Sequence, residues 1–559
     1  SGTTTLGINA ASIKSALEIT GNAGANTLTA TAFADTIAGG AGADTIVGGG
    51  GADQVTMEVA AGSLDAADAG GIAEGNQLVL TGAAAGTLVA DLASADQIVS
   101  IGGAAEVLRQ AGFLHVDAAA VTTAVSISGT AAANRITGGT GGDLIDGGAG
   151  NDTLAGGDGH DTVIGGTGAD TITLGAGAAD IDQVAAGADA ESNTLILQGT
   201  AGGTVVLDLS SATDQIVSVG GVAEGLVQTG LGNVDASAMG GGAVAITGSA
   251  LANTLRGTGM ADTLDGGAGA DTLYFVVGTA AYDQLDAGGG NEGDILKLEG
   301  TPAGEIVVDL GAAPGTDQLL SENGIAEGVV QADFQHVDAS GLAGLAGSDP
   351  GLSVFGNGAG NVMTGSLGQD NFVGFAGADT INLGGTYDAV AKLWTGDSAA
   401  DLVVYTSPDD GWNASAVAYS HDRLLAFETG RDAVAFTTEF NGGAWDLDDI
   451  TADDVFTFQA NDKADFSTAH EALLVAMDAK VKATVLTQPG FASVAAAVNK
   501  VGVVAAAGDD GLLVIKAGGS TGIYYYQESD GRANSVSGGE LTLLGVADAA
   551  LSEADFILG

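Results

Sequence analysis

The chain of 559 residues has no cysteine, only five prolines, and 14 basic residues against 70 acidic ones. Without cysteine, neither a disulfide nor a thiolate metal site can stabilise the fold. The net charge of −56 excludes nucleic acid as a partner, because a phosphate backbone is bound by basic surfaces. A membrane-spanning helix needs a run of about 18 apolar residues. The most apolar stretch, near residues 494–507, is interrupted by Asn499 and Lys500, so we expect no transmembrane segment.

Glycine, by contrast, occurs 95 times, and much of it surrounds Asp or Asn residues that recur at a strict spacing of nine. Each of these positions is followed two residues later by an apolar side chain. The positions form four trains, and every train opens with Asn and continues with Asp. The trains are Asn26, Asp35, Asp44, Asp53; Asn134, Asp143, Asp152, Asp161, Asp170; Asn253, Asp262, Asp271; and Asn361, Asp370, Asp379, Asp388.

One nine-residue unit, such as residues 39–47, divides into a six-residue glycine-rich loop and a three-residue strand. Glycine supplies the positive-φ positions that a tight loop demands. The strand buries one apolar residue, here Ile46, and becomes stable only when neighbouring units stack and share an interior. Two units make a coil of 18 residues, so we expect Asp35 to lie over Asp53.

Stacking of this kind brings carboxylates within a few ångströms of one another, and a cation is required to compensate their charge. The oxygens available are those of carboxylates and backbone carbonyls, with no thiolate or imidazole at a fixed spacing. Such ligands select a hard ion with flexible coordination, so the pattern predicts Ca²⁺ rather than Zn²⁺.

The pattern Gly-Gly-x-Gly-x-Asp-x-apolar-x, best seen at residues 147–154 and 266–273, resembles the RTX nonapeptide. That repeat is the calcium-binding parallel β-roll unit of bacterial secreted proteins. The resemblance implies that the sixteen Asp and Asn residues are ligands of multiple Ca²⁺ ions. Loops 31–35 and 366–370 depart from the pattern, with no glycine and one glycine, so we expect them to bind weakly. The opening Asn of each train fits an end rung, where a neutral amide oxygen suffices.

A longer repeat, with a period of 103 to 119 residues, becomes visible when the segments between the trains are compared. Each segment contains alternating strand-like stretches, such as residues 96–100, which reappear at 214–218. We therefore expect each unit to be a calcium roll followed by a wider β segment. The expected organisation is an N-terminal segment 1–18; three such units at 19–126, 127–245 and 246–353; a fourth roll with a divergent β segment at 354–440; and a C-terminal domain at 441–559.

The character of the chain changes after residue 391, where all three Trp and nine of the 14 basic residues lie. A capping box from Thr468 to Glu471 predicts a helix with an apolar face, and a second helix is expected after Pro489. The overall prediction is an all-β fold, a segmented parallel β-roll or β-helix, with a smaller α+β C-terminal domain. The start of the chain shows no Sec-type signal. The resemblance implies export through a type I channel that reads an uncleaved C-terminal signal.

Catalytic motifs are not convincing anywhere in the chain. His470 and Glu471 lack the second His of a zinc protease motif. The Gly-x-Ser-x-Gly match at residues 518–522 is followed by a Tyr-rich stretch, and no His lies beyond His470 to complete a triad. His115 and His336 occupy one repeat position that holds Asn233 in the middle copy, which argues against a catalytic role. We therefore expect no enzyme activity.

Three classes of function agree with these features. The first, which the RTX resemblance favours, is a secreted, calcium-rigidified structural protein that assembles with itself into a bacterial surface layer or extracellular filament. The second is an adhesin or matrix protein that binds cells or polysaccharide, with cell-surface polysaccharide bound through calcium. The third is the non-catalytic repeat portion of a larger exoenzyme. In each case the expected location is outside a Gram-negative cell.

Overall fold

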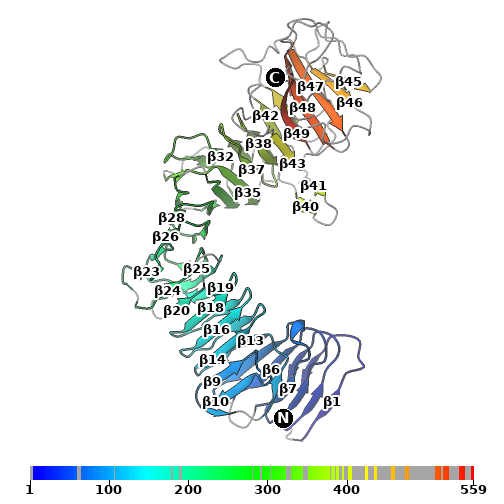
Figure 1. The fold of residues 1–559 in the computed structure, drawn as a ribbon, viewed down its shortest axis with the longest axis vertical. Coiled ribbons are helices and arrows are strands. Elements are labelled where there is room, and N and C mark those ends of the chain that lie inside the picture. Colours follow the sequence, from blue (N-terminus) through cyan, green and yellow to red (C-terminus); the bar gives the residue numbers. More distant parts are fainter. Residues whose placement is uncertain are drawn as a thin grey trace. The chain divides into compact units, whose positions relative to one another are not determined.

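The structure is a computed structural model (Figure 1). It divides into two compact units, Ser1–Asp271 and Thr272–Gly559. It describes residues 4–383 except 60–63, 106–107, 178–180, 188–191, 224, 280, 290–291, 303, 323–328, 344–350 and 378. Beyond them it describes residues 386–388, 393–395 and 401–405, together with the later strands given below. Burial of side chains is described as far as residue 403.

The described residues form an all-β fold in which helical structure is limited to one 3-10 turn, η1 (Ile72–Glu74). Successive short strands alternate between two parallel sheets that face each other across an apolar interior. Within the rolls, most strands begin directly after an Asp or Asn of a train, as at β5 (Thr45–Val47), which follows Asp44. The predicted parallel β-roll is therefore confirmed.

One sheet of the first unit is continuous and parallel throughout. The wider segments add strands to this sheet in the same register, because Leu78 pairs with Val55 on one side and with Val116 on the other. Its strands, in order, are β2 (Glu18–Thr20), β4 (Thr36–Ala38), β6 (Gln54–Glu58), β8 (Gln77–Gly82), β13 (His115–Val121), β15 (Arg135–Thr137), β17 (Thr153–Ala155), β19 (Thr171–Gly175), β21 (Thr194–Thr200), β25 (Asn233–Gly241) and β27 (Thr254–Arg256).

The opposite face of the first unit is broken once in each repeat. A sheet there ends on a two-residue strand, and the next begins with an antiparallel hairpin. The first sheet contains β1 (Gly7–Asn9), β3 (Thr27–Thr29), β5, β7 (Ala66–Asp68) and β12 (Gln110–Ala111). The second contains β11 (Ala104–Ala105), β10 (Ile98–Ile101), β9 (Leu88–Asp91), β14 (Val125–Thr130), β16 (Leu144–Ala149), β18 (Thr162–Thr167), β20 (Gln183–Ala185) and β24 (Gln228–Thr229). The third begins with β23 (Ile216–Val219), β22 (Val205–Asp208), β26 (Val244–Thr247) and β28 (Thr263–Asp265).

The second unit repeats the same plan, and one of its sheets contains two antiparallel pairings near its C-terminal end. One face carries β29 (Thr272–Val277), β31 (Ile295–Gly300), β35 (His336–Leu342), β37 (Val362–Thr364), β39 (Thr380–Asn382), β43 (Asp422–Leu425), β49 (Leu541–Ala547), β48 (Ser520–Gln527), β47 (Asp510–Ala517), β46 (Ala472–Ala476) and β45 (Val455–Gln459). The other carries β30 (Gln284–Asp286) and β34 (Gln331–Ala332), then β33 (Leu319–Glu322), β32 (Ile306–Asp309), β36 (Leu352–Phe355), β38 (Asp370–Val373), β42 (Leu402–Tyr405), β44 (Ala433–Phe436) and β50 (Phe556–Leu558). A separate pair is β40 (Thr386–Asp388) with β41 (Leu393–Thr395).

The apolar residue two positions after each Asp or Asn lies in the interior, as the repeat predicts. Leu28, Ile37 and Val55 are fully buried, and so are their counterparts in the later trains as far as Ile381. Val390, the last of the set, lies outside the described residues. Full burial of one Leu, Ile or Val stabilises the fold by about 1.5 to 3 kcal/mol, so the interior stabilises it only when many rungs stack.

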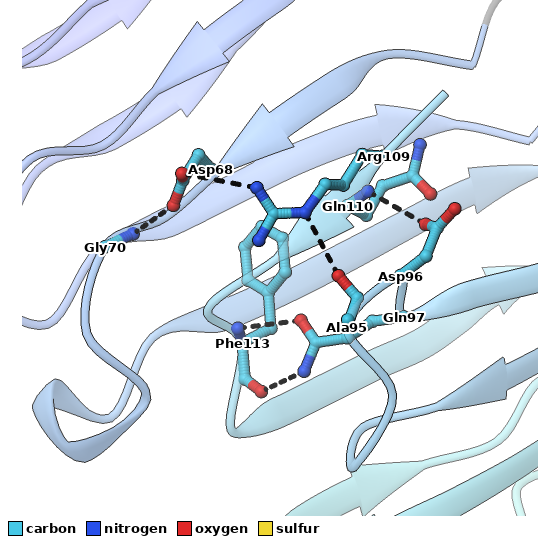
Figure 2. A network of polar contacts seen from close by, with 8 residues as sticks. All are labelled: Asp68, Gly70, Ala95, Asp96, Gln97, Arg109, Gln110 and Phe113. Atoms are coloured by element: carbon cyan, nitrogen blue, oxygen red, sulfur yellow. Dashed lines mark hydrogen bonds and ion pairs between the residues drawn. The ribbon is translucent and has the colours of Figure 1, made fainter. Parts of the chain in front are cut away.

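A buried glutamine fixes each corner at which one sheet ends and the next begins. Gln97 donates from Nε2 to the carbonyl oxygen of Leu92 at 2.8 Å. It also donates to the carbonyl oxygen of Phe113 at 2.7 Å, and its Oε1 accepts the Phe113 N–H at 2.9 Å (Figure 2). Gln215 and Gln318 make the corresponding bonds in the second and third copies. The wider segments are therefore structural repeats, as their sequences predict.

The helix predicted from Thr468 is wrong where the structure describes it. Ala472–Ala476 form β46, which pairs in parallel with β45 and β47. A short apolar run such as residues 472–476 satisfies both the helical and the strand period, and here pairing with neighbouring strands decides. The second predicted helix, after Pro489, lies outside the described residues. Ser520 begins strand β48, so the Gly-x-Ser-x-Gly match does not precede a helix.

Candidate metal sites

The Asp and Asn residues of the trains form buried ladders along the edges of the sheets. The Oδ1 atom of one residue accepts the backbone N–H of the residue 18 positions earlier. The bond from Asn26 N–H to Asp44 measures 2.6 Å, and the bond from Asp35 N–H to Asp53 measures 2.8 Å. The same bond occurs in the other trains, so the expected stacking of acid over acid is confirmed.

The ladder continues past the end of the nine-residue spacing, which the sequence analysis missed. The N–H groups of Asp44 and Asp53 donate to Asp65 and Asn76, both at 2.8 Å, across separations of 21 and 23 residues. Later ladders extend in the same way to Asp182, Asn193 and Asp401. A signal was present, because each of these five residues is also followed two positions later by a buried apolar side chain.

The opening Asn of each train uses both ends of its amide within the protein. Oδ1 of Asn134 accepts the Thr130 N–H at 2.6 Å, and its Nδ2 donates to the Leu114 carbonyl at 2.7 Å. Asn253 and Asn361 make the equivalent pairs of bonds. Asn26 accepts the Asn22 N–H in the same way, but its Nδ2 donates to the Gly24 carbonyl of its own loop. The amide N–H₂ thus holds a backbone carbonyl oxygen.

The second member of each train is also bonded within its own loop. Oδ2 of Asp35 accepts the N–H and the hydroxyl of Thr31, at 2.7 and 2.8 Å. Thr258 bonds Asp262 in the same way, Ser366 bonds Asp370 through its N–H and hydroxyl, and the Gly139 N–H donates to Asp143.

A third group of acids keeps one carboxylate oxygen without any hydrogen bond. Oδ2 of Asp44, Asp53, Asp152 and Asp161 has no partner, although these residues are only 1 to 2% exposed. In each loop the residue four positions earlier is a glycine with positive φ, between 96° and 106°. Glycine reaches this conformation readily, whereas Thr or Ser does not. The loop backbone therefore offers these oxygens no N–H.

The open oxygens converge on the first glycine of their loops. The point where a β-carbon on Gly147 would lie is 2.4 Å from Oδ2 of Asp152 and 2.7 Å from the Gly165 carbonyl oxygen. The corresponding point at Gly48 is 2.4 Å from Oδ2 of Asp53 and 2.8 Å from the Ala69 carbonyl. Protein oxygens bind Ca²⁺ at about 2.3 to 2.6 Å. A side chain on these glycines would fill a space lined by suitable ligands.

Burial raises the pKa of Asp53, Asp152 and Asp161 to about 6, since it penalises the charged form. The backbone N–H that each Oδ1 accepts acts in the opposite direction, and the carboxylate of the stacked acid adds to the rise. In the described part of the chain, no three His, Cys, Asp or Glu side chains gather at one point. Each cation would therefore take one or two carboxylates and several carbonyl oxygens, a donor set that fits Ca²⁺.

The repeated His position has a structural role. Nδ1 of His115 accepts the Arg135 N–H at 3.0 Å, and Nδ1 of His336 accepts the Val362 N–H at 3.0 Å. Asn233 accepts the Thr254 N–H at 2.7 Å in the middle copy, which explains the exchange of His for Asn. Burial lowers the pKa of both histidines and favours the neutral ring that can accept this bond.

A family model described as RTX calcium-binding nonapeptide repeat (4 copies) matches residues 20–55, 128–163, 155–178, 247–276 and 355–390. These ranges contain every residue of the four trains, whereas Asp65, Asn76, Asp182, Asn193 and Asp401 lie outside them. No curated protein matches the chain. Within the described residues, no helix is both long and apolar enough to cross a membrane.

Proposed function

Because this chain carries RTX calcium-binding nonapeptide repeats in four blocks, we propose that it is a secreted structural protein. Calcium makes it rigid, and copies of it assemble into a bacterial surface layer or an extracellular filament. The repeats bind several Ca²⁺ ions, which supply the charge compensation that the buried carboxylates require.

The calcium ions are assigned to the loops whose acid faces an open, oxygen-lined space at the first glycine. Asp44, Asp53, Asp152 and Asp161 meet this condition through their unpartnered Oδ2 atoms. Asp170 and Asp379 are assigned with them, because the residue four positions earlier, Gly166 or Phe375, has a positive φ. Their Oδ2 atoms lie 2.4 and 2.3 Å from the β-carbon points of Gly165 and Gly374. Asp271 is also assigned, because Gly267, four residues before it, is a glycine with positive φ. The side chain of Asp388 lies outside the described residues.

The observation that carries the structural role is the continuity of the scaffold. From β2 to β27, rolls and wider segments share one unbroken parallel sheet, and the second unit follows the same plan. The polar side chains that recur from copy to copy, Gln97 and His115 among them, are engaged in holding backbone. The matched family is a calcium-binding repeat and not an enzyme family.

Net charge supports a calcium-gated assembly. Two copies that each carry a formal charge of −56 repel one another strongly unless cations lie between them. Bound calcium lowers this repulsion and can bridge acidic faces.

Electron microscopy of the purified full chain, with 10 mM calcium and after complete removal of calcium, tests the proposal. We expect ordered sheets or filaments with calcium, which dissolve on chelation and re-form when calcium is restored. Magnesium at equal ionic strength serves as the control for simple charge screening.

Dispersed particles at every calcium concentration would contradict self-assembly. That outcome would favour an adhesin or matrix protein, or the repeat portion of an exoenzyme. A binding assay of the same preparation on polysaccharide and on whole cells would then separate these two classes.

A further inference from the structure

Asp65 is a fully buried acid outside the nonapeptide pattern. It directly precedes β7, twelve residues after Asp53, and lies beyond the matched residues 20–55. Its exposed fraction is 0%, and its Oδ1 accepts the Asp44 N–H at 2.8 Å. That bond accounts for one of its two oxygens.

The other oxygen of Asp65 points into a shared space. Oδ2 has no hydrogen-bond partner, and neither has Oδ2 of Asp44. The point where a β-carbon on Gly39 would lie is 2.3 Å from Oδ2 of Asp44 and 2.8 Å from Oδ2 of Asp65. Two buried carboxylate oxygens thus face one point that only a glycine leaves empty.

The neighbouring ladder shows how the same position is closed without a cation. Asn76 accepts the Asp53 N–H in the way that Asp65 accepts the Asp44 N–H. Its Nδ2, however, donates to the carbonyl oxygens of Ala69, Gly71 and Gly112. An amide supplies its own donors at this position, whereas a carboxylate has none to supply.

We propose that Asp65 and Asp44 together bind a calcium ion at Gly39. Two carboxylates balance the charge of one divalent ion, and oxygen ligands at this spacing suit Ca²⁺. The calcium ladder then extends one rung beyond the nonapeptides and ties the wider segment to the roll. In the second copy, Asp182 occupies the position of Asp65 and accepts the Asp161 N–H at 2.9 Å.

The test compares the number of calcium ions bound by the full chain and by Asp65→Asn, measured by equilibrium dialysis. We expect Asp65→Asn to bind one ion fewer, because its amide can donate to Asp44 in place of the ion. Asp68→Asn is the matched control: Asp68 lies on the same strand, its side chain is 54% exposed, and its loss should leave the count unchanged.

Two further variants, Asp44→Asn and the double variant Asp44→Asn with Asp65→Asn, test whether both residues bind the same ion. Both single variants and the double variant should lack the same one ion, and loss of two ions in the double variant would overturn the shared site. If folded Asp65→Asn binds as many calcium ions as the wild type, the role of Asp65 as a calcium ligand is overturned. Asp44 and Asp65 would then be a carboxylate pair that shares a proton. If circular dichroism shows that Asp65→Asn does not fold, the count is made on Asp65→Ser. The inference rests on calcium binding alone, so its failure and a failure of self-assembly are separate results.

Discussion

The residue four positions before each acid sets what the second oxygen of that acid can bind. Thr31, Thr258 and Ser366 turn a backbone N–H and a hydroxyl onto the carboxylate, as such residues do in short polar turns. Gly40 and Gly148, with positive φ, leave it open. The Asp at one repeat position therefore belongs to a hydrogen-bonded turn in one loop and to a proposed metal site in the next.

The variant Asp152→Ala with Asp161→Ala should raise the calcium concentration needed to fold the second roll. Extracellular calcium modules bind with a Kd of about 10⁻⁴ to 10⁻³ M, so at about 10 mM calcium each lost site removes about 1.4 to 2.7 kcal/mol. A calcium titration followed by circular dichroism measures the shift. The control is Asp158→Ala, which removes an exposed acid in the same loop as Asp161. A titration identical to that of the wild type would contradict the assignment.

Acid should partly replace calcium. The pKa of Asp53, Asp152 and Asp161 is raised by burial to about 6 and that of Asp65 to about 7, above the usual value near 4. The folded chain then binds more protons than the unfolded chain, so the stability of the calcium-free protein falls as pH rises through this window. We expect a higher melting temperature at pH 5 than at pH 7.5 in calcium-free protein, and a weaker calcium affinity at pH 5.

The control for this pH dependence is Asp152→Asn with Asp161→Asn, which removes two of the titrating groups. Its melting temperature should change less with pH than that of the wild type. An equal change would mean that the overall negative charge, rather than the buried acids, causes the effect.

At the scale of elements, the three-residue strands and their inward residues follow directly from the repeat. Ile37 and Leu154 are buried where the spacing places them. Side chains alternate along a strand, so a three-residue strand directs only its middle side chain into the interior. The wider segments were also predictable, since residues 78–80 fall in β8 and residues 89–91 of the stretch 89–92 fall in β9. The residues that extend the ladders carry the same apolar follower, but their positions break the nine-residue spacing. Their separations of 21, 23 and 31 residues depend on loops whose length no local rule fixes.

Gln97 should be essential for the corner between β9 and β12. Replacing it with Ala removes three hydrogen bonds and leaves buried backbone groups of Leu92 and Phe113 unpaired, at about 1 to 3 kcal/mol for each unsatisfied group. Urea unfolding should show this loss with an unchanged calcium count. Arg109→Ala is the control, since its side chain is 63% exposed and its ion pair with Asp68 spans 3.9 Å (Figure 2). Equal losses from both variants would mean that the corner is not held by Gln97.

At the scale of the molecule, the amino-acid composition indicates the conditions under which the chain can fold, rather than its shape. A chain with a net charge of −56 and 45% apolar residues can bury an interior only where its carboxylates are neutralised. The sequence alone indicates this need and the ion that meets it. The choice of loops that bind Ca²⁺ depends on the backbone conformation of each loop and on hydrogen bonds from neighbouring coils. Only the three-dimensional structure shows these features.

The order of loops within each block has a kinetic consequence. Every train begins with an amide-bonded Asn and a hydrogen-bonded Asp, as at Asn26 and Asp35, and open loops such as Asp44 follow. The first rungs can thus form before any ion arrives and can act as a template for the rungs after them. Contacts over about 18 residues form quickly. We therefore expect each of the four blocks to begin folding at its first rungs and to proceed toward the C-terminus as calcium binds.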